Sequence, residues 1–179
     1  MPTHIGFLRA VNIGKRPFKS ADLRAALTEA GYGDVDTYIQ TGNIRITSPL
    51  RSRAKIEAEL EAVYLADRGF EVPTVVLSPA ELTQVAADAD DIAAGITFSD
   101  GHYVSLLKEA PSAAGRATVE GRTGNGEYFV VRHRAVHMMY DVAYQEAKQS
   151  NAQIEKVLGV ATNRNVKVVR ELAERWGSR

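Results

Sequence analysis

The sequence predicts an α+β fold of two ferredoxin-like subdomains, at residues 1–78 and 79–179, in which helices cover one face of antiparallel or mixed sheets. Hydrophobic periodicity in the first subdomain indicates the element order βαββαβ, the split βαβ arrangement. The order βαββ recurs afterwards, so we expect a second, degenerate copy. With 179 residues and 45% hydrophobic content, the chain is long enough to bury a substantial core as one compact unit.

The first half opens with a buried strand that leads into a polar loop. Apolar residues dominate from residue 5 to about residue 11, which predicts the strand, and residues 12–17 form the loop. Ser20 is placed to cap the following helix, whose apolar side chains recur on one face, and Gly31 ends it. The chain therefore begins as strand, basic loop and helix.

A hairpin, a second helix and a fourth strand complete the first half. Apolar and polar residues alternate between residues 35 and 47, with Thr41 and Gly42 at the turn, which predicts two paired strands. An amphipathic helix follows and ends at Gly69. The apolar residues 70–77 predict the last strand of the unit.

The second half repeats part of this order after a connecting helix. Ser78 and Glu81 have the spacing of a capping box, so a helix begins there, and we expect it to lead into an acidic loop with Asp88, Asp90 and Asp91. A strand, a weak helix, a hairpin and two further helices are expected at residues 102–108, 112–120, 127–140, 154–159 and 166–176.

Composition and charge limit the function classes. The 22 basic and 22 acidic residues cancel, so no global field attracts nucleic acid, although every full charge in residues 1–21 is basic. The absence of Cys excludes disulfides and thiolate chemistry and agrees with a reducing compartment. No signal peptide or membrane-spanning run is visible, so we expect a cytoplasmic protein outside the membrane. The oligomeric state cannot be inferred from these features.

No catalytic or cofactor motif indicates a reaction. Gly14 and Lys15 lack the preceding Gly of a Walker loop, and the Gly-rich residues 121–126 have the wrong spacing for a dinucleotide fingerprint. His102 and His137 fall in expected strands, with no partner at metal-ligand spacing, and are interpreted as sheet residues. We therefore expect no metal and no cofactor, and whether the chain is an enzyme stays open.

Three polar clusters are candidate binding residues. The first follows the first strand, the second surrounds the hairpin turn, and the third precedes the last helix. The clusters are Arg9, Asn12 and Lys15; Tyr38, Gln40 and Asn43; and Asn163, Arg164 and Asn165. Cations bind anions, amides offer donors and acceptors, and a helix start offers free N–H groups. Structural alternatives are that Asn43 is only a turn residue and that Asn165 or Thr162 is only a helix cap.

Three short blocks resemble the signature of a known family. Residues 8–14 (LRAVNIG), 37–43 (TYIQTGN) and 162–165 (TNRN) are similar to the blocks of domain-of-unknown-function family 1697. The resemblance extends over nearly the whole chain. It implies a bacterial protein built from ferredoxin-like subdomains, and it implies no reaction.

Three functional hypotheses follow from these residues. In the first, the three clusters converge on one cleft that accepts an anionic small molecule, a nucleotide or a nucleic-acid segment. In the second, the chain is an enzyme for a phosphorylated or nucleotide-like substrate, and Arg9, Lys15 or Arg164 stabilises developing negative charge. In the third, the chain is a structural or protein-interaction module whose signature residues only hold turns and caps.

Overall fold

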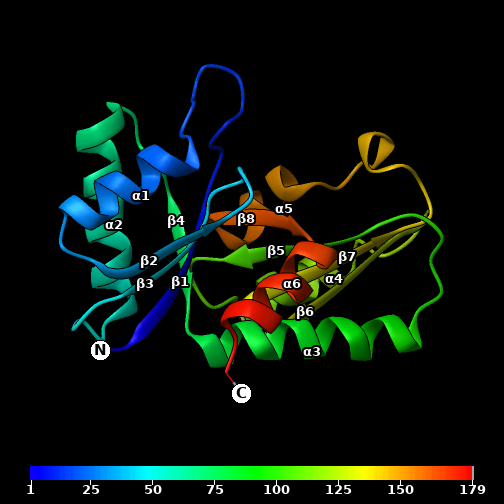
Figure 1. The fold of residues 1–179 in the computed structure, drawn as a ribbon. Coiled ribbons are helices and arrows are strands. Elements are labelled where there is room, and N and C mark those ends of the chain that lie inside the picture. The colour runs from blue at the N-terminus through cyan, green and yellow to red at the C-terminus, as the bar shows by residue number, and fades with distance from the viewer. Residues whose placement is uncertain (179) are drawn as a thin grey trace. The chain divides into compact units, whose positions relative to one another are not determined.

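The computed structural model describes residues 1–178 and divides them into two units. Unit 1 comprises Met1–Leu82 together with residues 176–178, and unit 2 comprises Thr83–Arg175. Each unit contains a four-stranded antiparallel sheet with helices packed on it (Figure 1). The predicted α+β fold class is confirmed.

In the sheet of unit 1, the spatial order of the strands differs from their order in the sequence. Its strands are β1 (Thr3–Leu8), β2 (Gly33–Tyr38), β3 (Asn43–Thr47) and β4 (Thr74–Leu77). They lie in the order β2-β3-β1-β4, and every neighbouring pair is antiparallel. The end of β1 therefore lies at the centre of the sheet, next to the start of β3.

Helices α1 (Ser20–Glu29) and α2 (Arg53–Arg68) cover one face of this sheet (Figure 1). The expected cap at Ser20 is wrong, because Lys19 occupies the N-cap position and no side chain caps the helix. The expected stop at Gly69 is confirmed, since this residue adopts φ 74° and its N–H donates to the Leu65 carbonyl. Glycine tolerates that left-handed conformation without a steric penalty.

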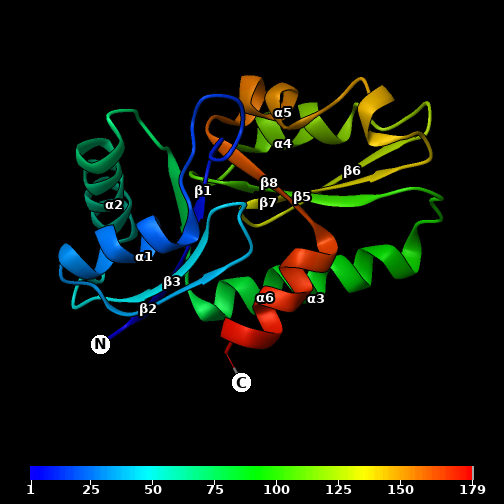
Figure 2. The same ribbon diagram turned by 45° about the horizontal axis from the view of Figure 1, so that its top comes forward.

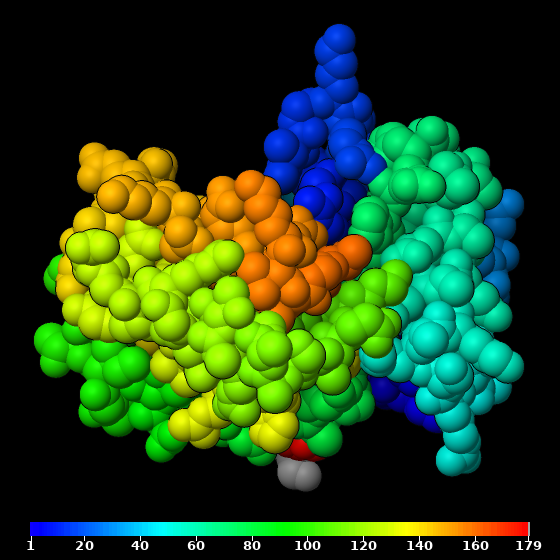
Figure 3. Space-filling view, turned by 180° about the vertical axis from the view of Figure 1, so that it is seen from behind, coloured from blue at the N-terminus to red at the C-terminus, as the bar shows by residue number. Residues whose placement is uncertain are grey.

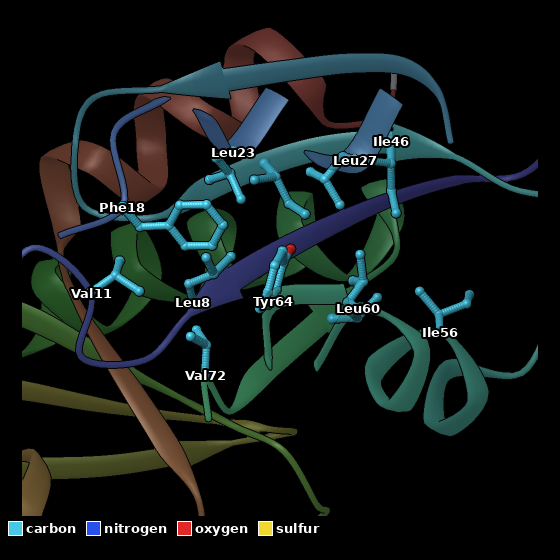
Figure 4. Close-up of a cluster of buried hydrophobic side chains, with 12 residues drawn as sticks. Leu8, Val11, Phe18, Leu23, Leu27, Ile46, Ile56, Leu60, Tyr64 and Val72 are labelled. Atoms are coloured by element: carbon cyan, nitrogen blue, oxygen red, sulfur yellow. The ribbon is translucent and has the colours of Figure 1, made fainter. Parts of the chain in front are cut away.

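One hydrophobic core joins the two helices to the sheet of unit 1. Phe18 and Tyr64 lie at its centre with ring centroids 5.5 Å apart and nearly perpendicular planes. Figure 4 shows these rings among aliphatic side chains from both helices, from three of the strands and from the loops between them. Its buried members are Leu8, Val11, Phe18, Leu23, Leu27, Ile44, Ile46, Ile56, Leu60, Tyr64, Val72 and Val76.

Carboxylates of α2 accept hydrogen bonds from the backbone of the edge strand β4. The backbone N–H groups of Thr74 and Val76 donate to Glu61 Oε1 and Glu57 Oε1, at 2.8 and 3.0 Å. Glu57 is itself buried, and Arg53 contacts it from one turn earlier at 3.3 Å. The unit thus satisfies an edge that would otherwise present unpaired backbone groups.

The sheet of unit 2 repeats the strand order of unit 1. Its strands are β5 (His102–Leu107), β6 (Glu127–Arg132), β7 (Ala135–Tyr140) and β8 (Ala161–Asn165). They lie in the order β6-β7-β5-β8, again with antiparallel neighbours. The predicted hairpin in this half is therefore confirmed as β6 and β7.

Strand β8 corrects the expectation of a degenerate second half. The sequence predicts only a polar segment before the last helix at residues 162–165, but these residues pair with β5. The start of β8 is held by the helix before it: Ala161 N donates to Glu155 Oε1 at 2.9 Å, and Asn151 Nδ2 donates to the Ala161 carbonyl at 3.0 Å. Unit 2 therefore has the complete order βαββαβ.

Helices cover both faces of the second sheet, which corrects the expectation of one covered face. Helices α4 (Ala113–Glu120) and α5 (Asn151–Leu158) lie on one side, and α3 (Pro79–Gly95) and α6 (Val166–Trp176) lie on the other (Figure 2). Residues on both faces of β5 are fully buried, in agreement with this arrangement. A short 3-10 helix, η1 (Tyr144–Glu146), precedes α5.

The acidic residues expected in a loop belong to helix α3 instead. The predicted capping box is confirmed: Ser78 N donates to Glu81 Oε2 at 2.8 Å, and Glu81 N donates to Ser78 Oγ at 3.2 Å. The helix continues to Gly95 because apolar side chains recur along its buried face. Among residues 1–178, no helix has the length and apolar character needed to cross a membrane.

Candidate functional site

The first two signature clusters meet at the end of β1 in unit 1. Phe7 pairs with Asn43 across the sheet, and Leu8 N donates to the Gly42 carbonyl at 2.8 Å. Gly42 adopts φ 75°, and a Cβ on it would lie 2.7 Å from Leu8 Cβ and from Val11 Cγ2. Only glycine fits this close approach of the hairpin turn to β1.

Asn12 ties the loop after β1 to the hairpin turn. Its Nδ2 donates to the Phe18 carbonyl at 3.0 Å and to the Gln40 carbonyl at 2.6 Å, and its Oδ1 accepts from Phe18 N at 2.7 Å. Asn12 adopts φ 57°, a left-handed conformation that asparagine tolerates better than most residues. Its side chain thereby fixes a strained loop, and both of its N–H donors are occupied.

Asn43 has a comparable role inside the turn. It is fully buried, and its Nδ2 donates to the Tyr38 carbonyl at 3.0 Å and to Thr41 Oγ1 at 2.9 Å. These bonds support the interpretation of Asn43 as a turn residue. Tyr38 is half-buried on β2, and Gln40 is exposed at the turn itself.

Lys15 lies on the exposed part of a loop whose base is anchored. Arg9 is half-buried, and its backbone N–H donates to the Pro73 carbonyl at 2.9 Å. Arg16 places its guanidinium 4.8 Å from the centroid of the Phe70 ring and donates to the Glu71 carbonyl. The segment after β1 projects from unit 1, and it is coloured blue in Figure 3.

The third cluster lies in unit 2, at the junction of β8 and α6. Arg164 is 7% exposed, and its Nη1 donates to Thr162 Oγ1 at 2.8 Å and to the Asn163 carbonyl at 2.7 Å. Burial lowers the pKa of the Arg164 guanidinium to about 10. Asn165 Oδ1 accepts from Lys167 N at 2.9 Å, so the alternative that Asn165 caps the helix is confirmed.

The structure brings together two of the three predicted clusters. The residues from Arg9 to Lys15 and from Tyr38 to Asn43 adjoin one another within unit 1. The cluster around Arg164 belongs to unit 2. A cleft shared by all three clusters stays a prediction.

A pocket of about 330 Å³ lies beside the start of α6 and was not predicted from the sequence. Its wall combines cations, an acid, aromatic rings and a buried imidazole. The lining includes Phe98, Asp100, His102, Tyr103, Asn165, Lys167 and Arg170. The spacing of Lys167 and Arg170, three residues apart after a helix-capping Asn, is the signal that could have indicated this site, because such residues share one helical face.

A buried pair of histidines connects β5 and β7 behind this pocket. His102 Nε2 lies 3.3 Å from His137 Nδ1, and both side chains are buried. Burial, reinforced by the Arg170 charge, lowers the pKa of His102 to about 4, and burial with the His102 and Arg132 charges lowers that of His137 to about 3. Both imidazoles are therefore neutral at pH 7. The prediction that both residues lie in strands is confirmed, in β5 and β7.

In the part of the chain that the structure describes, the two histidines each keep one ring nitrogen without a hydrogen bond, and they do not form part of a metal site. His102 Nδ1 and His137 Nε2 are buried and have no hydrogen-bond partner among residues 1–178. Within the same residues, no group of three or more His, Asp or Glu side chains is placed to hold a metal ion.

Comparison with known proteins places the chain in a family and shows its fold. Residues 1–137 match the family described as Protein of unknown function (DUF1697), and the first two signature blocks lie in this range. The chain is similar to the conserved bacterial protein SP0830 from Streptococcus pneumoniae, with 21% identity, a TM-score of 0.76 and 98% of each chain covered. Among curated proteins, no significant match was found.

Proposed function

The chain belongs to the DUF1697 family, and from this premise we propose that it binds a small anionic ligand, such as a nucleotide, through the loops at the end of β1. The observation that supports this proposal most directly is the meeting of two signature clusters in unit 1, joined by the bond from Asn12 to Gln40. The loop after β1 and the hairpin turn therefore adjoin one another within unit 1.

The charges and donors on the surface of these two loops suit an anion. Every full charge in residues 1–21 is basic, and Lys15 is exposed on the projecting loop. Lys15 makes no ion pair within residues 1–178 that would neutralise it before a ligand arrives. Gln40 adds an exposed amide with both donors and an acceptor. A nucleotide presents both a phosphate for the cation and a base edge for the amide.

A structural or protein-interaction role is the second candidate, and it is favoured by the bonds of the two asparagines. The side-chain N–H groups of Asn12 and Asn43 donate to backbone carbonyls and to the Thr41 hydroxyl. Ile13 and Ile39 in the same two loops are 66% and 44% exposed. Two exposed aliphatic side chains on anchored loops suit contact with a protein partner.

Two finer assignments belong to the same proposal. We infer that both units are ferredoxin-like, supported by their shared strand order and by the helices inserted after the first and third strands. We also propose a cytoplasmic location, supported by the absence of Cys from the sequence.

Thermal unfolding against nucleotides and phosphorylated metabolites tests the binding proposal. A ligand that binds the native state raises the midpoint by mass action, since it adds about 2.7 kcal/mol to the free energy of unfolding at a hundred times its Kd. We expect Lys15→Ala to abolish the increase while the midpoint without ligand stays unchanged. Lys55→Ala, an exposed site on α2, is the matched control. If no compound raises the midpoint, or if Lys15→Ala responds like the control, binding at this surface is refuted and the interaction role is favoured.

A further inference from the structure

The geometry of unit 2 points to a second binding site, in the pocket beside the start of α6. We propose that this pocket takes a small organic anion, with its anionic group at the first turn of α6 and its apolar body against Phe98. The site goes beyond the function proposed for unit 1, since it shares no residue with the loops at the end of β1. Of the residues predicted from the sequence, only Asn165 lines it.

The first turn of α6 supplies positive charge. The helix has 11 residues, and the N–H groups of a first helical turn have no partner within the helix. Asn165 Oδ1 already accepts from Lys167 N, so the other N–H groups of this turn and the side chains supply the attraction for an anion. Lys167 is exposed, and no ion pair within residues 1–178 neutralises it. Arg170 lies one turn later on the same face, and Asp90 Oδ1 holds its guanidinium through Nε at 2.8 Å and Nη2 at 2.6 Å. The guanidinium is therefore oriented before a ligand binds.

His102 supplies an independent reason to expect a ligand. The residue lines the pocket, is only 5% exposed, and leaves Nδ1 without a partner among residues 1–178. Its Nε2 is directed at His137 on β7. Because the two ring nitrogens point to opposite sides of an imidazole, Nδ1 is directed away from β7. That is the side on which β8 leads into α6.

Buried polar atoms are normally hydrogen-bonded, so the unpaired Nδ1 of His102 is a position where a ligand atom or an ordered water can form the missing hydrogen bond. The imidazole is neutral at pH 7, because burial and the Arg170 charge lower its pKa to about 4. It can therefore offer one hydrogen bond, as donor or acceptor according to its tautomer, without adding charge. A ligand oxygen or an ordered water held by the ligand fits this requirement.

The Phe98 ring and the size of the pocket define the rest of the ligand. Phe98 is half-buried, and its ring meets the His102 ring edge-on with centroids 5.8 Å apart. The Tyr103 ring stacks instead on Tyr144, with centroids 4.3 Å apart. A volume of about 330 Å³ is at the lower end of small-molecule pockets. Asp100 adds a carboxylate to the wall, which disfavours a polyanion. The best ligand is therefore compact, with one anionic group and one ring.

Phenyl phosphate, inorganic phosphate and phenol test these features separately in an NMR titration of the full chain at about pH 7. Phenyl phosphate is expected to shift the backbone amides of Val166, Lys167 and Phe98 and the ring nitrogens of His102. It should bind at least about tenfold more tightly than inorganic phosphate, which lacks the ring, and phenol should leave these signals unchanged. Dispersed amide signals in every sample confirm that the protein stays folded.

Substitutions separate this pocket from the rest of the molecule. Lys167→Ala should weaken phenyl phosphate roughly tenfold, whereas Lys156→Ala on α5, which removes an equal charge outside the pocket, should have no effect. The proposal is overturned if Lys167→Ala binds as tightly as the wild type, or if the amides beside α6 do not move. Shifts confined to residues 9–15 and 38–43 would also overturn it, while supporting the site proposed in unit 1.

Discussion

Acidification should destabilise unit 2 through the His102 and His137 pair. In the unfolded chain each imidazole has its ordinary pKa of 6.5, whereas burial in the native state lowers these values to about 4 and about 3. At pH values between the native pKa values and 6.5, the unfolded state therefore binds more protons than the native state. Stability is fully present above about pH 6.5 and decreases as the pH falls toward the native pKa values.

The size of the effect follows from the same values. At about pH 5, one histidine that titrates at 6.5 when unfolded and stays neutral when folded removes about 2 kcal/mol of stability. Two such histidines remove about 4 kcal/mol, which is a large share of the free energy of unfolding of a typical domain, about 5–15 kcal/mol. Acidification to this pH should therefore produce a clear fall in the urea midpoint.

Urea unfolding of two variants isolates the pair from other titrating groups. His137→Asn keeps a polar group beside His102 but removes one titration, so its loss of stability between about pH 7.5 and about pH 5 should be about 2 kcal/mol smaller than in the wild type. His133→Asn is the control, since His133 is exposed in a turn at φ 50°, where asparagine is well tolerated. If the wild type and His137→Asn lose stability in parallel, the reasoning from burial is refuted.

Substitutions at three further positions test the contacts that hold unit 1, each by its change in the free energy of unfolding in urea. Gly42→Ala should cost about 1–3 kcal/mol, because its Cβ would lie 2.7 Å from Leu8 Cβ in a backbone at φ 75°; an unchanged midpoint would contradict this packing. Glu57→Ala should cost about 1–3 kcal/mol by leaving the buried Val76 N–H without its acceptor, and Glu57→Gln, which keeps an acceptor oxygen, should cost less. Asn12→Ala should cost a similar amount, and Asn12→Asp, which retains only the bond from Phe18 N, should recover part of it.

Local patterns were sufficient to predict most of the first half of the fold. The switch from helical to alternating periodicity marks the strands on either side of Thr41 and Gly42, and Gly69 ends α2 in the conformation expected of it. These signals are local, because a turn or a helix end is determined by the residues that form it. Ser20 shows the limit of such signals, since a residue of the right type lies one position too late to cap α1.

Strand β8 could not be predicted in this way, because its reason for being a strand lies elsewhere in the chain. Residues 162–165 are polar and show no apolar alternation. They extend because β5 offers a free edge, and because Glu155 and Asn151 of α5 satisfy the groups of Ala161. The helices on both faces of the second sheet likewise depend on tertiary packing, which periodicity within one element does not show.

The candidate sites differ from the predicted residues for a related reason. Residue type identifies a group that is able to bind, but an amide binds its own backbone as readily as a ligand. Asn12 and Asn43 are satisfied in this way, whereas His102, interpreted from the sequence as an ordinary sheet residue, keeps a buried nitrogen that nothing in residues 1–178 satisfies. Whether a polar group has a hydrogen-bond partner depends on residues far away in the sequence. His102 Nε2, for example, lies beside His137 on another strand, whereas its Nδ1 has no such neighbour among residues 1–178. The unsatisfied nitrogen of His102 and the unneutralised charges of Lys15 and Lys167 are therefore stronger indications of binding than the signature asparagines.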